Sequence, residues 1–324
     1  MSLPASGGRT ARARIGRWIR RELGQHPPKA KSLVVTVWGD AIAPHGGAVW
    51  LSGLIRLLAP LGLNERLVRT NVYRLAQEGW LSTLQDGRRS LYRLTAAGLQ
   101  RFEHAYRRIY APPARDWDGR WEIVLAPSAV LAAGERRDLR KELGWEGFGP
   151  IAAGVFVRPV RAALGGAAQE IVRSLGLDRR VAVLIARDPP GAVQGSLRAL
   201  AVDCWDLAAL ATEYRRFMAR FGPVLEALRA HTDHDPEQCF IVRTLLIHAF
   251  RRVTLHDPQL PAELLPVDWP GPAAYVLCRD FYRLTHQSAE RHLGAILETR
   301  NGPLPPTAPY FFERFGGLYR ERFG

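Results

Sequence analysis

Residues 64–93 constrain the fold of this chain more than any other stretch. Asn64 is a typical helix N-cap, Glu65 is an acid in the first turn, and Gly79 closes the run. The apolar residues between them recur at the spacing that lines one face of an α-helix: Val68, Val72, Leu75 and Ala76. The pattern predicts an amphipathic helix with these residues buried.

The other side of this helix carries no acid. Its residues are Arg66, Arg69, Thr70, Tyr73, Arg74 and Gln77. Arginine can pair bidentately with guanine, glutamine can pair with adenine, and threonine can contact the thymine methyl group. This mixture suits the DNA major groove, whereas a solvated helix face is the alternative, and the helix alone favours neither.

A predicted hairpin follows the helix directly. Strand-like residues on both sides flank Asp86-Gly87, a pair that favours a two-residue turn, and Arg88 and Arg89 stand at or just past the tip. Upstream, residues 50–58 form a short apolar helix that ends at Pro60 and Gly62. The order helix, turn, helix, hairpin predicts a winged helix-turn-helix, whose hairpin arginines would contact phosphate or the minor groove.

The positive charge of the chain is concentrated at its N-terminal end. Residues 1–110 hold 18 Lys and Arg against 6 Asp and Glu, whereas residues 111–324 hold 27 against 25. A uniform composition bias would not divide the charge in this way, so we expect a domain that faces a polyanion, joined to a nearly neutral body. DNA is favoured over an anionic membrane because the chain has no long apolar run and no lipidation signal.

Length and composition indicate an ordinary globular protein with room for two or three domains: 324 residues, 47% hydrophobic and 23% charged. The N-terminus lacks the apolar core of a signal peptide, so we expect a cytoplasmic protein. Cys204, Cys239 and Cys278 have neither zinc-site nor disulfide spacing, and we expect buried thiols.

Three blocks follow from the predicted elements, and together they make an α+β protein. Residues 1–111 carry a basic amphipathic helix at 12–23, whose apolar side we expect to pack on the DNA-binding domain or on a partner subunit, and then the winged helix. Residues 115–188 alternate strands and helices in the order β-α-β-α-β, as in a ferredoxin-like domain. Residues 192–324 are mostly helical, with helices expected at 207–231, 236–254 and 280–298.

Several segments of the chain carry long, distinctive motifs: SLVVTVWGDAIAPHGGAVWL, IRLLAPLGLNERLVRTNVYRLAQEGWL, GRRSLYRLTAAGLQRFEHAYRRIY, WDGRWEIVL and DPQLPAELLPVDWPG. These segments resemble the PaaX family of transcriptional repressors of phenylacetic acid degradation, and the match runs from about Arg14 to Glu298. The resemblance implies a winged helix, a middle ferredoxin-like domain and a helical C-terminal domain in a homodimer. It also implies operator binding that is relieved by an aryl-CoA thioester such as phenylacetyl-CoA.

The family pattern places the same residues at the DNA as the residue-by-residue reading. The expected contacts are Arg66, Arg69, Thr70, Asn71, Tyr73, Arg74 and Gln77 on the recognition helix, with Arg88 and Arg89 on the wing. Asn71 stands where serine is expected in the family, which leaves the operator sequence open.

The effector that the resemblance implies would need arginines for its phosphates and apolar walls for its acyl arm. Arg243, His248, Arg251 and Arg252 lie on one C-terminal helix and are our candidates. The alternative, which we favour, is that the arginines pair with acids such as Asp257 and that His248 is a core residue.

Catalytic chemistry is weakly represented. The middle domain resembles small ferredoxin-like nucleases, but its first strand ends at Ala126 with no aspartate to hold a metal. The cluster of His231, Asp233, His234 and Asp235 is better explained by helix capping before Pro236 than by metal binding. We therefore expect no enzyme, no metal and no cofactor, with a metal-dependent nuclease or a non-specific nucleic-acid-binding protein as the alternative to a repressor.

Overall fold

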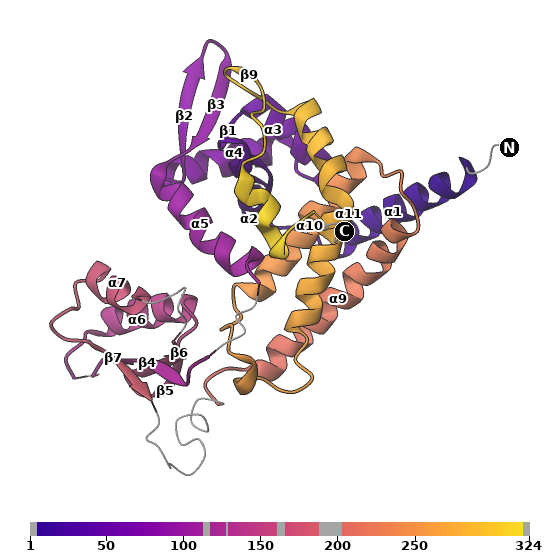
Figure 1. Cartoon of the computed structure of the whole chain (residues 1–324). Coiled ribbons are helices and arrows are strands. Elements are labelled where there is room, and N and C mark those ends of the chain that lie inside the picture. The colour runs from indigo at the N-terminus through magenta and orange to yellow at the C-terminus, as the bar shows by residue number, and fades with distance from the viewer. Residues whose placement is uncertain (1–4, 113–116, 128, 161–165, 188–202, 320–324) are drawn as a thin grey trace. The chain divides into compact units, whose positions relative to one another are not determined.

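The computed structural model describes residues 5–112, 117–127, 129–160, 166–187 and 203–319 (Figure 1). The chain divides into two compact units, the first made of residues 1–112, 216–252 and 273–324, and the second of residues 113–215 and 253–272. Helices and antiparallel sheets occur together, which makes this an α+β protein. The domain boundaries expected at 111–115 and 188–192 fall largely outside the described residues.

The N-terminal part of the first unit is built from short helices and one small sheet. Its elements are α1 (Ala5–Gln25), α2 (Ala30–Val37), η1 (Trp38–Ile42), η2 (Ala43–His45), β1 (Ala48–Trp50), α3 (Leu51–Leu58), η3 (Ala59–Leu61), α4 (Glu65–Gln77), β2 (Leu81–Asp86), β3 (Arg89–Leu94) and α5 (Ala96–Tyr110). The three strands are antiparallel in the order β1-β3-β2. Strand β1 was not foreseen from the sequence.

Helix α4 begins where its cap predicts. The Asn64 side chain accepts a hydrogen bond from the Leu67 amide at 2.9 Å, and Gly79 has a φ of +74° just past the end of the helix. Val68, Val72 and Leu75 are buried as predicted, whereas Ala76 is half-buried. The local pattern therefore identified the inward face of this helix correctly.

The hairpin turn lies one residue later than predicted. Asp86 pairs with Arg89 in the ladder, so the turn residues are Gly87 and Arg88 rather than Asp86 and Gly87. Gly87 has a φ of +56°, and positive φ at the first turn residue alone is the signature of a type II′ turn. Arg88 consequently sits in the turn itself, and Arg89 begins β3.

Long helices complete the first unit. They are most of α9 (Leu207–Arg229), α10 (Pro236–Thr254) and α11 (Gly271–Ile296), followed by β8 (Glu298–Thr299), β9 (Gly302–Pro303) and η6 (Pro309–Gly316). Helix α11 starts nine residues before the predicted Asp280, because Pro272 falls in its first turn, where a missing N–H breaks no helical hydrogen bond.

The apolar side of helix α1 packs on α9, whereas the sequence led us to expect contact with the predicted winged helix or with a partner subunit. The indole N–H of Trp18 donates to the Arg220 carbonyl at 3.1 Å, and its ring lies 5.3 Å from that of Phe221. Ile15 and Ile19 are buried on the same side of the helix. Arg12 of the same helix pairs with Asp235, just before α10, at 2.7 Å.

The second unit contains one antiparallel sheet in the order β5-β6-β4-β7. Its elements are β4 (Arg120–Leu125), α6 (Ala133–Trp145), β5 (Gly149–Ala152), β6 (Val155–Pro159), α7 (Ala167–Ser174), β7 (Ala182–Arg187) and η5 (Ala262–Leu264). Strand β5 was missed from the sequence, because the four residues GPIA are too short and too mixed to show alternation.

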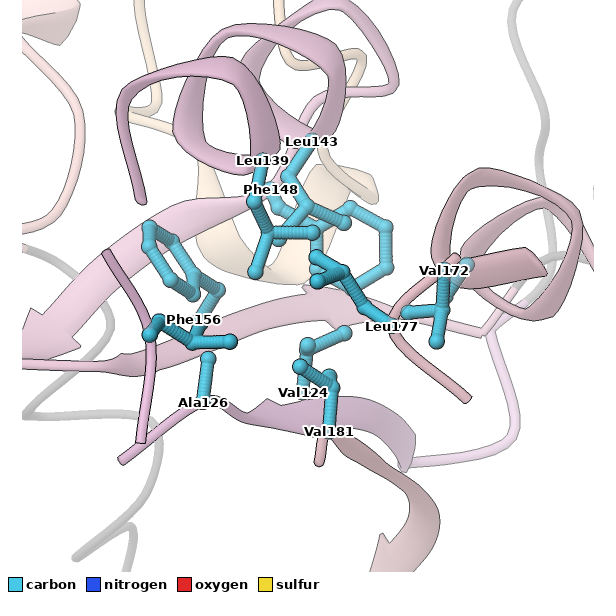
Figure 2. Close-up of a cluster of buried hydrophobic side chains, with 11 residues drawn as sticks. Val124, Ala126, Leu139, Leu143, Phe148, Phe156, Val172, Leu177 and Val181 are labelled. Carbon is cyan, nitrogen blue, oxygen red and sulfur yellow. The ribbon is translucent and has the colours of Figure 1, made fainter. Parts of the chain in front are cut away.

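Each face of this sheet has its own apolar cluster. Figure 2 shows the cluster on the helix side, where Val124 and Phe156 of the sheet meet Leu139 and Leu143 of α6. The other face buries Trp121 and Val157 against Leu260 and Leu264 of the proline-rich loop before α11. The loop is therefore packed structure and supplies the second half of the core. None of the described helices is long and apolar enough to cross a membrane.

Candidate nucleic-acid interface

The outward face of α4 is exposed along its whole length. Its residues are Arg66, Arg69, Thr70, Tyr73, Arg74 and Gln77, as predicted. Tyr73 is 59% exposed, whereas tyrosine is usually more buried in folded proteins. This face presents three guanidinium groups, two hydroxyls and an amide to solvent, all of them groups that bind phosphate or base edges.

Arg69 is partly engaged within the helix. Its guanidinium lies 2.7 Å from the Glu65 carboxylate one turn earlier, and both side chains are more than half exposed. Exposed i,i+4 pairs contribute only about 0.3 to 0.5 kcal/mol, so a phosphate or a guanine can displace Glu65 at little cost. Glu65 thus orients the arginine in the free protein without locking it.

Asn71 does not share this exposed face. It is only 6% exposed, and its side-chain amide donates to the Leu67 carbonyl at 2.8 Å. The expectation that Asn71 contacts DNA is therefore corrected, because the residue lies among Val68, Val72 and Leu75 on the inward side. Its spacing of three residues from Val68 was the signal that could have shown this.

The hairpin arginines are both exposed, but they differ in their surroundings. No ion pair with Arg88 occurs within the described part of the chain, whereas Arg89 stacks on the Trp50 ring at 4.0 Å and lies 3.8 Å from the Glu298 carboxylate. Arg300 lies at the same distance from Asp86 of β2. The hairpin of β8 and β9 thus reaches the hairpin of β2 and β3, a placement that sequence reasoning missed because more than 200 residues separate the two.

The four effector candidates do not converge on one open pocket. Arg243 is fully buried and is paired with Asp40 at 3.5 Å and with Glu290 at 2.8 Å. These two carboxylates already balance its positive charge. Burial opposes ionisation of Glu290, but Arg243 and then His45 outweigh it and hold its pKa at about 2. An arginine placed in this way cannot meet a ligand phosphate from solvent.

His248 and Arg251 share one partner on α2. The Thr36 hydroxyl donates to the Ser32 carbonyl, lies 3.0 Å from His248 Nδ1 and accepts from Arg251 at 2.9 Å. Burial, followed by the charges of Arg251 and Arg252, lowers the pKa of His248 to about 4. His248 is thus a neutral core residue, which agrees with the alternative we favoured, and Arg252 is exposed.

Arg251 lines a cavity. The cavity lies between α2, α5 and α10, and aromatic side chains form much of its wall: Trp80, Phe102, Tyr106 and Tyr110. No carboxylate lies within ion-pair distance of Arg251 in the part of the chain that the structure describes. Burial lowers the pKa of this arginine, so the site would favour an added negative charge.

The second unit shows no sign of a metal centre in its described residues, and the same holds for the described residues of the first. Glu122 of β4 is 3% exposed and is paired at 2.6 Å with Arg158, which stands opposite it on β6. In the first unit Asp235 caps α10 by accepting from the Gln238 amide at 2.9 Å, as expected from the sequence.

The cysteines are free thiols. Cys239 and Cys278 are buried as expected, but Cys204 is only half-buried. Burial raises the pKa of Cys204 to about 11 and that of Cys239 to about 12, so neither is a reactive thiolate.

A buried polar network ties the C-terminal segment to η1 and α5. Asp40 of η1 accepts hydrogen bonds from the hydroxyls of Tyr110 and Tyr282 and from the guanidinium of Arg314. Phe311 and Phe315 pack beside Arg314 with about 1% exposure or less. Helix η6, which carries these residues, therefore belongs to the core of the first unit and contacts α5 as well as α11.

Comparisons with known proteins agree over most of the chain. Family models match three successive segments, described as PaaX-like protein over residues 29–98, PaaX protein central Cas2-like domain over 114–197 and PaaX-like protein C-terminal domain over 205–295. The chain is 35% identical over 311 residues to the transcriptional repressor PaaX of Escherichia coli K12, covering 96% of this chain and 97% of that protein.

A solved structure is also similar. It is that of an uncharacterized protein from Mycobacterium tuberculosis, 27% identical, with a TM-score of 0.52, covering 82% of this chain and 98% of the other.

Proposed function

Because the chain belongs to the PaaX family of transcriptional repressors, we propose that it represses phenylacetate catabolic genes by binding their operator DNA. The observation that carries the proposal is the exposed face of α4, which combines three arginines with Thr70, Tyr73 and Gln77 beside a hairpin with arginines at its tip. Contact with solvent alone does not require these particular groups to lie together on one face of a helix.

In this proposal the first unit contains a winged helix-turn-helix. Helix α3, the turn at η3 and helix α4 make the helix-turn-helix, α4 enters the major groove, and β2 and β3 form the wing. The second unit is a ferredoxin-like domain in this scheme. Its strand order of β5-β6-β4-β7, with α6 and α7 on one face, supports that assignment.

The test is a footprint on DNA upstream of the protein's own transcription unit and its neighbours. We expect a protected, pseudo-palindromic site, and Arg74→Ala should weaken binding to it by about 1 to 3 kcal/mol if the arginine reads a base. Asp233→Asn, an exposed change away from α4, is the control. Equal loss of affinity for the operator and for random DNA would reduce Arg74 to a phosphate contact, and no protected site would overturn the repressor.

We propose a homodimer as the DNA-binding form, which sets two copies of α4 in successive major grooves. Strand β7 supports this, because it is an edge strand on which Leu184 and Ile185 are 47% and 53% exposed. Such an edge favours pairing with a second chain. Ile185→Lys should shift sedimentation toward the monomer, whereas Arg187→Lys should not; an unchanged dimer in both would exclude this edge.

The proposed effector is an aryl-CoA thioester such as phenylacetyl-CoA. It releases the operator by favouring a form of the dimer in which the two winged helices are spaced differently. Among the candidate residues Arg251 supports this proposal, because it lines a cavity with aromatic walls. Arg251→Met should raise the thioester concentration needed to release operator DNA by about tenfold, with operator affinity unchanged. Arg252→Met is the matched control, and equal effects from both variants would argue against the cavity.

A further inference from the structure

The hairpin formed by β8 and β9 is fixed against the DNA-binding elements at its base. Trp50 of β1 donates through its indole N–H to the Thr299 carbonyl at 2.9 Å, and Arg56 of α3 donates to the Ile296 carbonyl at 3.0 Å. Leu297 between them is completely buried. In Figure 1, β9 lies beside the tip of the wing, although it follows the wing by some 200 residues. We call residues 298–303 the C-terminal hairpin.

Glycine at position 53 allows this close approach. A Cβ atom there would lie 3.3 Å from both the Ile296 carbonyl oxygen and the Leu297 side chain, tighter than ordinary van der Waals contact. The two backbone segments are thus in direct contact, and the C-terminal hairpin is held by α3 and β1 rather than resting loosely on the surface.

The tips of the wing and the C-terminal hairpin carry crossed charges. Wing residue Arg89 faces hairpin residue Glu298, and hairpin residue Arg300 faces wing residue Asp86, each pair at 3.8 Å. All four side chains are more than half exposed. A distance of 3.8 Å is beyond hydrogen-bond range, so the guanidinium N–H groups remain available to stronger acceptors.

We propose, on the basis of the DNA-binding function above, that the C-terminal hairpin is part of the DNA-binding surface and that Arg300 binds a backbone phosphate beside the wing. Phosphate oxygens accept charge-assisted, bidentate hydrogen bonds from arginine, and they replace the long contacts to Asp86 and Glu298. With Arg88 in the turn, three arginines then face the duplex at one point.

The acids at this point set the strength of the contact. Glu298 competes with phosphate for Arg89, and Asp86 competes for Arg300. Removing an arginine and removing an acid must therefore have opposite effects on DNA affinity. A hairpin that only braced the wing would not produce these opposite signs.

The test measures binding of the full-length protein to a labelled random-sequence duplex of about three helical turns over a range of salt concentrations. Arg300→Ala should lower the slope of log affinity against log salt by about 1 and weaken binding at all salts, whereas Glu298→Gln should strengthen binding. Arg291→Ala is the control, because it removes an exposed arginine of α11 that donates a hydrogen bond to Ser288 of the same helix. It should change neither the salt slope nor the affinity.

An unchanged salt slope in Arg300→Ala, or an equal loss in Arg300→Ala and Arg291→Ala, would overturn the assignment. The footprint described above separates this outcome from failure of the repressor. If the wild-type protein protects an operator and Arg74→Ala weakens that protection, while Arg300→Ala and Glu298→Gln behave as wild type, only the hairpin inference fails. If no site is protected by the wild-type protein, the repressor proposal fails.

Discussion

Replacing Asp40 with Asn should destabilise the first unit by about 3 kcal/mol. Asp40 is 2% exposed and is surrounded by Arg243, Arg314 and the hydroxyls of Tyr110 and Tyr282. Breaking a buried ion pair from one side typically costs about 3 to 5 kcal/mol, because a charge is left without compensation. We expect the lower end, since an Asn carbonyl can still accept from both tyrosines.

The cost should be concentrated at Arg314. Arg243 keeps Glu290 at 2.8 Å when Asp40 is neutralised, whereas no second carboxylate reaches Arg314 among the residues that the structure describes. The double variant Asp40→Asn, Arg314→Leu should therefore be less destabilised than the sum of its single variants by at least about 1 kcal/mol. Asp233→Asn, an exposed substitution, should be neutral.

Hydrogen exchange followed by mass spectrometry is the suitable assay, because a chain of two compact units need not unfold in one step. A loss of about 3 kcal/mol corresponds to exchange about a hundredfold faster in the core peptides of α2 and α11. If Asp40→Asn changed exchange less than about fivefold, or if the two substitutions were additive within about 0.5 kcal/mol, the buried charges would not be coupled as argued.

Two further predictions concern the same unit. Folding lowers the pKa of His248 from its usual 6.5 to about 4, so the stability that neutral His248 contributes is complete above pH 6.5 and is lost as the pH falls toward 4. This loss of folding free energy amounts to about 3 kcal/mol. His248→Gln should flatten the acid side of a curve of stability against pH, and an unchanged curve would refute the assignment. Gly98→Ala should destabilise the protein by about 1 to 3 kcal/mol and weaken DNA binding, since its Cβ would lie 2.2 Å from the Trp80 carbonyl oxygen. Gly24→Ala is the control and should stabilise α1 slightly, because a Cβ there meets nothing within 4 Å. Thermal unfolding that ranked the two variants the other way would contradict this prediction.

The helices with strong local signals could be predicted from the sequence alone. The Asn64 cap and the spacing of Val68, Val72 and Leu75 located α4 and its inward face. These features depend on neighbours three or four residues apart, which a sequence displays directly. The six outward residues of α4 were found for the same reason.

The tertiary structure alone decided which polar residues are available. Arg243 resembled a ligand-binding arginine in the sequence, but Asp40 and Glu290 approach it from other helices and bury it. Arg300 had no local signal at all, and it lies near Asp86 of β2 because residues 296–299 contact β1 and α3. Burial and ion pairing depend on contacts between residues far apart in sequence, and such contacts leave no periodic trace in the chain.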